Sequence, residues 1–184
     1  MLTDANPRMS VYYRSLVWLS GLGLLAAAVW HILTLMGIEL SRSLWMPLSI
    51  GMFVVWFPAV ISALPLNDRI RDAPRDAWKI ILGGAPTWMC LTVLYIGIYA
   101  IVNWVLTTGG LSGITSNDEH FPRVGSGVIT LFYATAMAIL YSSGARANAI
   151  SCSEGHLIYP GQQSCPVCGQ SRDRAKVEVL RHGA

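Results

Sequence analysis

The chain has 184 residues, of which 53% are hydrophobic and only 12% are charged, and its formal net charge is +3. The charged share is about half of that in an ordinary soluble domain, so the composition argues against a soluble globular protein. It favours a protein that places most of its surface in lipid.

Four long stretches of the sequence contain no Asp, Glu, Lys or Arg. They cover residues 15–38, 43–66, 80–117 and 124–145. A hydrocarbon core about 30 Å thick requires roughly 20 apolar residues in a helix, and each stretch reaches that length. We therefore predict an all-α membrane protein in which four transmembrane helices form a bundle within residues 1–146, with spans at about 16–36, 44–64, 81–106 and 127–143.

Basic residues are distributed unevenly over the connections between these spans. Two alternate connections contain only Arg42 and Arg123, whereas every other Lys and Arg lies in the N-terminal arm, in the segment 67–79 or after the fourth span. Because basic residues are enriched in cytoplasmic loops, we predict a multi-pass protein of the cell (inner) membrane with both termini in the cytoplasm. This topology explains the positive charge without a nucleic-acid partner. The segment 67–79, where acidic and basic residues recur at helical intervals, suits either a short surface helix or a solvated loop.

Two polar residues inside the predicted spans are candidates for a role beyond packing. Ionisable residues within a membrane are functional candidates, so His31 is either a ligand or proton relay, or a neutral imidazole that finds a partner near the interface. We expect Asn103 to form a hydrogen bond between helices. The connection 107–123 contains Asp118, Glu119 and His120, which indicates a solvated polar loop or a weak cation site.

The C-terminal part of the chain contains a cluster of metal-ligand residues. Cys152, His156, Cys165 and Cys168 follow the spacing C-x3-H-x8-C-x2-C. Thiolate and imidazole ligands are typical of Zn²⁺, which is bound by four protein ligands in structural sites and by three in catalytic ones. We therefore predict a structural zinc site, with iron as the alternative metal. A redox-active C-x-x-C is a further alternative, while disulfides are disfavoured in a reducing compartment.

Residues 150–170 resemble a small zinc ribbon, with the pattern "C…GH…P-G…CP-x-CG". The first pair, C-x3-H, departs from the C-x2-C that such ribbons typically contain in both knuckles. The resemblance implies a metal-stabilised module that docks partners, and it implies no chemistry. We accordingly predict a cytoplasmic zinc-ribbon-like domain with a basic tail at 147–184.

Motifs for enzymatic chemistry are not found in the sequence: it contains no H-E-x-x-H and no nucleophile elbow, and its glycine-rich segment lacks the strand–helix context of a phosphate loop. We therefore expect a non-enzymatic subunit, assembly factor or adaptor of a membrane complex, whose partners are the lipid bilayer and other membrane or cytoplasmic subunits. The alternatives are a homo-oligomeric channel or transporter, and a membrane sensor that responds to metal or redox state.

Overall fold

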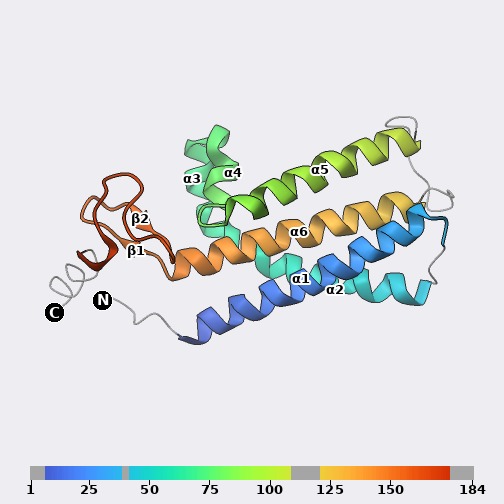
Figure 1. Ribbon diagram of the computed structural model, residues 1–184, viewed down its shortest axis with the longest axis horizontal. Helices are drawn as coiled ribbons and strands as arrows, with labels where there is room; N and C mark the ends of the chain where they lie inside the picture. Colours follow the sequence, from blue (N-terminus) through green and yellow to red (C-terminus); the bar gives the residue numbers. More distant parts are fainter. Residues whose placement is uncertain (1–6, 39–41, 109–120, 175–184) are drawn as a thin grey trace.

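The computed structural model describes residues 7–38, 42–108 and 121–174. Within these ranges the chain is mainly helical (Figure 1), and its long helices are α1 (Pro7–Leu35), α2 (Arg42–Ala63), α5 (Thr87–Thr108) and α6 (Phe121–Ala147). Each of the four is long and apolar enough to cross a membrane. The predicted basic tail beyond residue 174 and most of the connection 107–123, including His120, lie outside the described residues.

Helix α6 lies at the centre of the helical part. It packs against α1, α2 and α5, while those three helices contact one another much less, and in Figure 1 it runs between α5 and the pair α1 and α2. Small residues on α6, among them Ala134 and Ala138, are completely buried. Small side chains allow helix backbones to approach closely, which explains how one helix can contact three others.

Tyr133 of α6 fills the space left by two glycines on neighbouring helices. Its ring lies where a side chain on Gly23 of α1 would be, and its hydroxyl is 2.6 Å from the position of a Cβ atom on Gly51 of α2. The hydroxyl donates a hydrogen bond of 2.9 Å to the carbonyl oxygen of Leu48. One aromatic side chain therefore sets the register of three helices.

The outward faces of α1, α2 and α5 are apolar. Large hydrophobic side chains along these helices are exposed, with Leu22, Phe57 and Leu106 among those more than 60% exposed. Exposed apolar area on this scale exceeds what a monomeric soluble protein presents. A hydrocarbon environment accounts for it.

The third long helix begins later than the sequence predicts. Whereas we expected a span at 81–106, α5 starts at Thr87, and residues 82–86 form an irregular turn. The turn contains Gly83 and Gly84 and ends at Pro86, whose ring prevents the preceding residues from continuing a helix. The fourth helix, α6, extends beyond the predicted 127–143 in both directions, and the polar residues Ser126 and Ser143 near the ends of that range are buried and hydrogen-bonded.

The segment between α2 and α5 forms short helical pieces on the side of the C-terminal lobe (Figure 1). They are two 3₁₀ turns and two short helices: η1 (Leu64–Leu66), α3 (Asn67–Asp72), η2 (Pro74–Asp76) and α4 (Ala77–Ile81). Of the two expectations for 67–79, the helical one is closer. The helical pieces α3 and η2 are separated by Ala73, whose φ of −136° is extended, as is usual for a residue before proline.

Candidate metal centre

The residues after α6 form a small lobe, here the C-terminal lobe (residues 150–174). Strand β1 (Ile150–Ser151) pairs antiparallel with β2 (Leu157–Ile158), so that Ile150 faces Ile158 and Ser151 faces Leu157. Ile158 is fully buried together with Cys152 and Cys165. A core of three residues is too small to stabilise a fold by apolar burial alone, which points to a further stabilising element.

The four predicted ligands come together in this lobe. The thiols of Cys152, Cys165 and Cys168 and one ring nitrogen of His156 all lie within 4.8 Å of one another. The Sγ atoms of Cys152 and Cys168 are 3.6 Å apart, and Cys152 Sγ lies 3.6 Å from His156 Nδ1. The four side chains therefore lie close enough to hold one metal ion.

These distances can be compared with those of a tetrahedral zinc site. With Zn–S near 2.3 Å and Zn–N near 2.0–2.1 Å, tetrahedral geometry separates two sulfurs by roughly 3.8 Å and a sulfur from a nitrogen by roughly 3.5 Å. The distance of 3.6 Å between Cys152 Sγ and Cys168 Sγ and that of 3.6 Å between Cys152 Sγ and His156 Nδ1 are close to these two values. The donor set, three thiols and an imidazole, also belongs to zinc chemistry. The residues thus fit the ion, and all four positions of a tetrahedron would be filled by protein.

Two tight turns position the ligands. Cys152 accepts a backbone hydrogen bond from Gly155 N–H, and Cys165 accepts one from Gly169 N–H. Gly155 and Gly169 have φ values of 78° and 75°, in the left-handed region that glycine adopts without steric cost. Each turn thereby directs the two ligands of a pair to the same side.

The backbone also favours the ionised form of one thiol. A hydrogen bond from the N–H of Cys168 is the main reason why the pKa of the Cys165 thiol falls from 9.0 to about 6. For Cys168, the N–H of Gln170 favours the thiolate, but the adjacent sulfurs of Cys165 and Cys152 raise its pKa overall. Closely spaced thiols resist simultaneous ionisation, and a bound cation removes that repulsion.

Gln170 connects the two halves of the lobe, a role that the ligand spacing does not reveal. Its Oε1 accepts hydrogen bonds from Ser153 N–H (2.7 Å) and from the Ser153 hydroxyl (2.9 Å). Its backbone carbonyl accepts one from Cys165 N–H at 2.8 Å. Gln170 therefore links the turn that carries Cys152 to the turn that carries Cys165.

Specific contacts surround the point where the lobe meets the helical part. The Arg146 guanidinium at the end of α6 donates hydrogen bonds to the carbonyl oxygens of Ile81 (2.8 Å) and Ile80 (3.3 Å), and to the hydroxyl of Ser143 (2.9 Å). The Tyr159 ring follows β2 and packs on Gly83 and Gly84. The Arg146 bonds satisfy carbonyl groups at the end of α4 and join α4 to α6, while Tyr159 brings the lobe against the turn that precedes α5.

A second polar cluster lies at the opposite end of the long helices. His31 of α1 is buried, with Nδ1 2.8 Å from the Ser126 hydroxyl on α6 and Nε2 2.7 Å from the Tyr99 hydroxyl on α5. The Ser126 hydroxyl also lies 3.1 Å from the carbonyl oxygen of Arg123, and hydroxyl groups can donate or accept, so each ring nitrogen has a suitable partner in either neutral tautomer. Both nitrogens of a neutral imidazole are thereby satisfied.

Asn103 extends this cluster towards the end of α6. Its Oδ1 accepts a hydrogen bond of 3.0 Å from Arg123 Nε, and its Nδ2 donates to the Arg123 carbonyl at 3.5 Å. The expected hydrogen bond between helices is thus present, from α5 to α6. The partners Tyr99, Ser126 and Arg123 were not identified from the sequence, in which a tyrosine or serine in a helix has no distinguishing pattern.

Fold and site together define a helical protein with four helices able to cross a membrane and a C-terminal Cys₃His cluster able to hold a metal ion. No family model, no curated protein and no solved structure matches the chain. The functional argument therefore rests on the geometry described above.

Proposed function

We propose that the protein is a non-enzymatic subunit, assembly factor or adaptor of a membrane complex, with a zinc-ribbon-like lobe that docks a cytoplasmic protein partner. The observation that carries this proposal is the closed ligand set of the lobe. Four protein ligands leave zinc no free position for a substrate or water, and catalytic zinc needs one. The metal then has a structural role.

Zinc is the metal that the donor set favours. Iron in a site of this size would normally have four thiolates, whereas the lobe offers three thiols and one imidazole. For so small a lobe the ion would supply much of the folding free energy, on the order of 10 kcal/mol by analogy with zinc fingers. Loss of zinc would thus unfold the docking surface.

We place the lobe in the cytoplasm and the four-helix bundle in the cell (inner) membrane. The basic residues Arg14, Lys79, Arg146 and Arg172 all belong to the end of the molecule that carries the lobe, while Arg123 belongs to the other end. This distribution supports cytoplasmic termini under the positive-inside rule. In a reducing cytoplasm the cysteines stay available as metal ligands.

The docking surface would include the exposed turn between Cys165 and Cys168. Val167 at its tip is 70% exposed, and an exposed apolar side chain on a rigid turn suits a protein contact. The lobe also contacts the helical part through Tyr159, which packs on Gly83 and Gly84. A partner bound there would be held at a defined position next to the membrane.

Affinity purification of the full chain in mild detergent, with metal analysis of the same sample, tests the proposal. We expect about one zinc per chain and co-purifying proteins. Val167→Asp should lose these proteins and keep the zinc, whereas Gln163→Asp, which adds the same charge at an exposed site outside the turn, should keep both.

The same experiment distinguishes the alternative functions. A monodisperse homo-oligomer without partners would contradict the adaptor and favour a channel or transporter. Zinc that is lost and regained reversibly at physiological zinc or oxidant levels would favour a sensor. Partner recovery that is equal for Val167→Asp and the unchanged chain would exclude the turn as the docking surface.

A further inference from the structure

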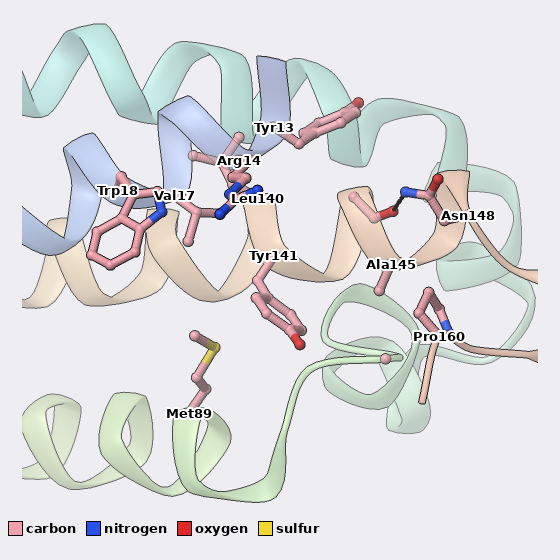
Figure 2. Close-up of a pocket in the computed structure, with 12 residues that line it drawn as sticks. Tyr13, Arg14, Val17, Trp18, Met89, Leu140, Tyr141, Ala145, Asn148 and Pro160 are labelled. Carbon is pink, nitrogen blue, oxygen red and sulfur yellow. Dashed lines mark hydrogen bonds between the residues drawn. The ribbon is translucent and has the colours of Figure 1, made fainter. Parts of the chain in front are cut away.

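A groove lies between α1 and α5 at the end of the helices that carries the lobe. Its volume is about 420 Å³, within the range of small-molecule sites. Figure 2 shows α6 as its floor, with Leu140 and Tyr141, while Trp18 comes from α1 and Met89 from α5. Pro160 of the C-terminal lobe lines the groove at one end (Figure 2).

The packing of the helices explains why this groove exists. Helices α1 and α5 both pack on α6 but contact each other very little. The hydrogen bond between His31 and Tyr99 joins them at the far end. At the end near the lobe the space between them is occupied by the groove, and it opens between two helices whose outer faces are apolar and exposed.

The walls of the groove differ in chemistry along its length. Trp18, Met89 and Leu140 provide an apolar body, while Arg14 and Asn148 provide polar groups. Arg14 carries the one charge among the described residues that line the groove, and the structure shows no hydrogen bond or ion pair from it to any described residue. A guanidinium next to an apolar channel suits an anion that is covalently attached to an apolar chain.

The position of the groove decides between a lipid and a soluble anion. Arg14 lies one helical turn before Trp18, near the start of the apolar part of α1 at Val11. Arginine and tryptophan at such a boundary are at the level of lipid headgroups. A soluble phosphate would gain nothing from the apolar walls, whereas an acyl chain would replace water on them.

We propose that this groove binds one anionic phospholipid, with its phosphate on Arg14 and one acyl chain along Trp18, Leu140 and Met89 between α1 and α5. The site is separate from the metal cluster and from the exposed turn at Val167. It requires that the helices lie in a membrane, and it does not require a protein partner. Because Pro160 borders the groove, the bound lipid would contact the lobe as well as the helices.

Native mass spectrometry of the zinc-loaded full chain, stripped of lipid in detergent, tests the proposal. The probes are phosphatidylglycerol, phosphatidylcholine with the same acyl chains, and soluble glycerophosphate. We expect one phosphatidylglycerol per chain to be retained in preference to phosphatidylcholine. Arg14→Gln should weaken retention by about fivefold, the effect of losing one interfacial charge, and Arg14→Lys should keep most of it.

Arg71→Gln is the matched control, since Arg71 belongs to α3 near the same end and its side chain is largely exposed. It should leave lipid retention unchanged. A phosphatidylglycerol with a photoreactive acyl chain should crosslink to α5 or α6 at the groove, and Arg14→Gln should reduce these crosslinks selectively. Zinc content and the unfolding midpoint, measured on the same samples, should not change in either variant.

Three results would overturn the proposal. The first is that the unchanged chain retains phosphatidylglycerol and phosphatidylcholine equally. The second is that Arg14→Gln and Arg71→Gln lose phosphatidylglycerol retention to the same extent. The third is that an equal concentration of glycerophosphate displaces the lipid. The third would identify a site for soluble phosphate instead. If Arg14→Gln loses the lipid and keeps its protein partners, the lipid site is supported, and lipid binding and partner docking are independent.

Discussion

Tyr159 of the C-terminal lobe lies against Gly84, in the turn that precedes α5. A Cβ atom on Gly84 would lie 2.8 Å from Tyr159 Cδ1 and 3.1 Å from the Cβ atom of Ala145. These separations are shorter than ordinary van der Waals contacts between carbon atoms. The position of the lobe thus depends on a backbone that carries no side chain at this point.

Gly84→Ala should displace the lobe without removing the metal. The ring must move to admit the methyl group, and overpacking of this kind costs about 1–3 kcal/mol. We expect a lower unfolding midpoint in detergent and faster proteolysis between α6 and β1, with zinc content unchanged. The control is Gly161→Ala, which has a similar positive φ of 89° but no atom near its Cβ position. An equal effect in both variants would show that backbone strain, and not contact with Tyr159, is responsible.

Removing one thiol ligand should abolish zinc retention. In Cys165→Ser the remaining ligands, Cys152, His156 and Cys168, cannot complete the tetrahedron, so the lobe loses a stabilisation on the order of 10 kcal/mol. Elemental analysis of purified protein should find no zinc. Cys90 lies in α5 and is the remaining cysteine outside the cluster, so Cys90→Ser should retain about one zinc per chain. Full occupancy in the Cys165→Ser, Cys168→Ser double variant would exclude the site.

The lobe should bind zinc more weakly as the pH falls. The pKa of Cys165 is about 6 in the folded lobe and 9.0 ordinarily, so the folded state binds the proton more weakly. The Cys165 thiolate therefore makes its full contribution to the free energy of folding above pH 9.0, and this contribution decreases as the pH falls and is absent below about 6. Zinc affinity should fall over the same range because protons compete for the thiolate. Zinc titrations at several pH values would measure this, and a flat profile would contradict it.

Local sequence patterns predicted the long helices and the metal cluster, whose causes are local, but missed the start of α5. Each long helix follows from an uninterrupted apolar run, and the metal cluster follows from ligand spacings within 17 residues of chain, from Cys152 to Cys168. The late start of α5 also has a local cause, because Pro86 ends one segment and begins the next. We placed the helix boundary before Pro86, since hydropathy alone does not distinguish an apolar turn from an apolar helix.

Contacts between distant segments were not predictable in the same way. His31 meets Tyr99 and Ser126, which are 68 and 95 residues away in sequence. Such pairs depend on the rotation and register of whole helices, and one sequence does not encode these in a visible pattern. The same holds for Tyr159 on Gly84, where two unremarkable residues meet because Arg146 fixes the end of α6 to α4.

Tyr99→Phe should destabilise the packing of α5 on the other helices. The change removes the hydroxyl that satisfies Nε2 of buried His31, and hydrogen bonds within membrane proteins contribute about 0.6 kcal/mol on average, up to about 1.7. We expect the free energy of unfolding, measured in detergent, to fall by an amount in that range. Tyr95→Phe, one turn earlier and 74% exposed, should have no effect. A double-mutant cycle with His31→Phe should show that the two losses are not additive, and strict additivity would mean that the hydrogen bond contributes nothing.

Gly23→Ala should disturb the packing of α1 on α6 more than any exposed substitution on α1. The added methyl group would occupy the space of the Tyr133 ring, which is 3% exposed and held by its hydrogen bond to Leu48. Because neither helix can yield without breaking other contacts, we expect a cost of about 1–3 kcal/mol.

Gly21→Ala provides the control for this substitution. A Cβ atom on Gly21 would lie 3.7 Å from the sulfur of Met137, an ordinary contact, and the change from glycine to alanine favours a helix by up to about 1 kcal/mol. We therefore expect Gly21→Ala to raise the free energy of unfolding and Gly23→Ala to lower it. Tyr133→Ala should relieve the clash, so that Gly23→Ala costs less in that background. If both glycine variants behave alike, the packing of Tyr133 does not set the distance between α1 and α6.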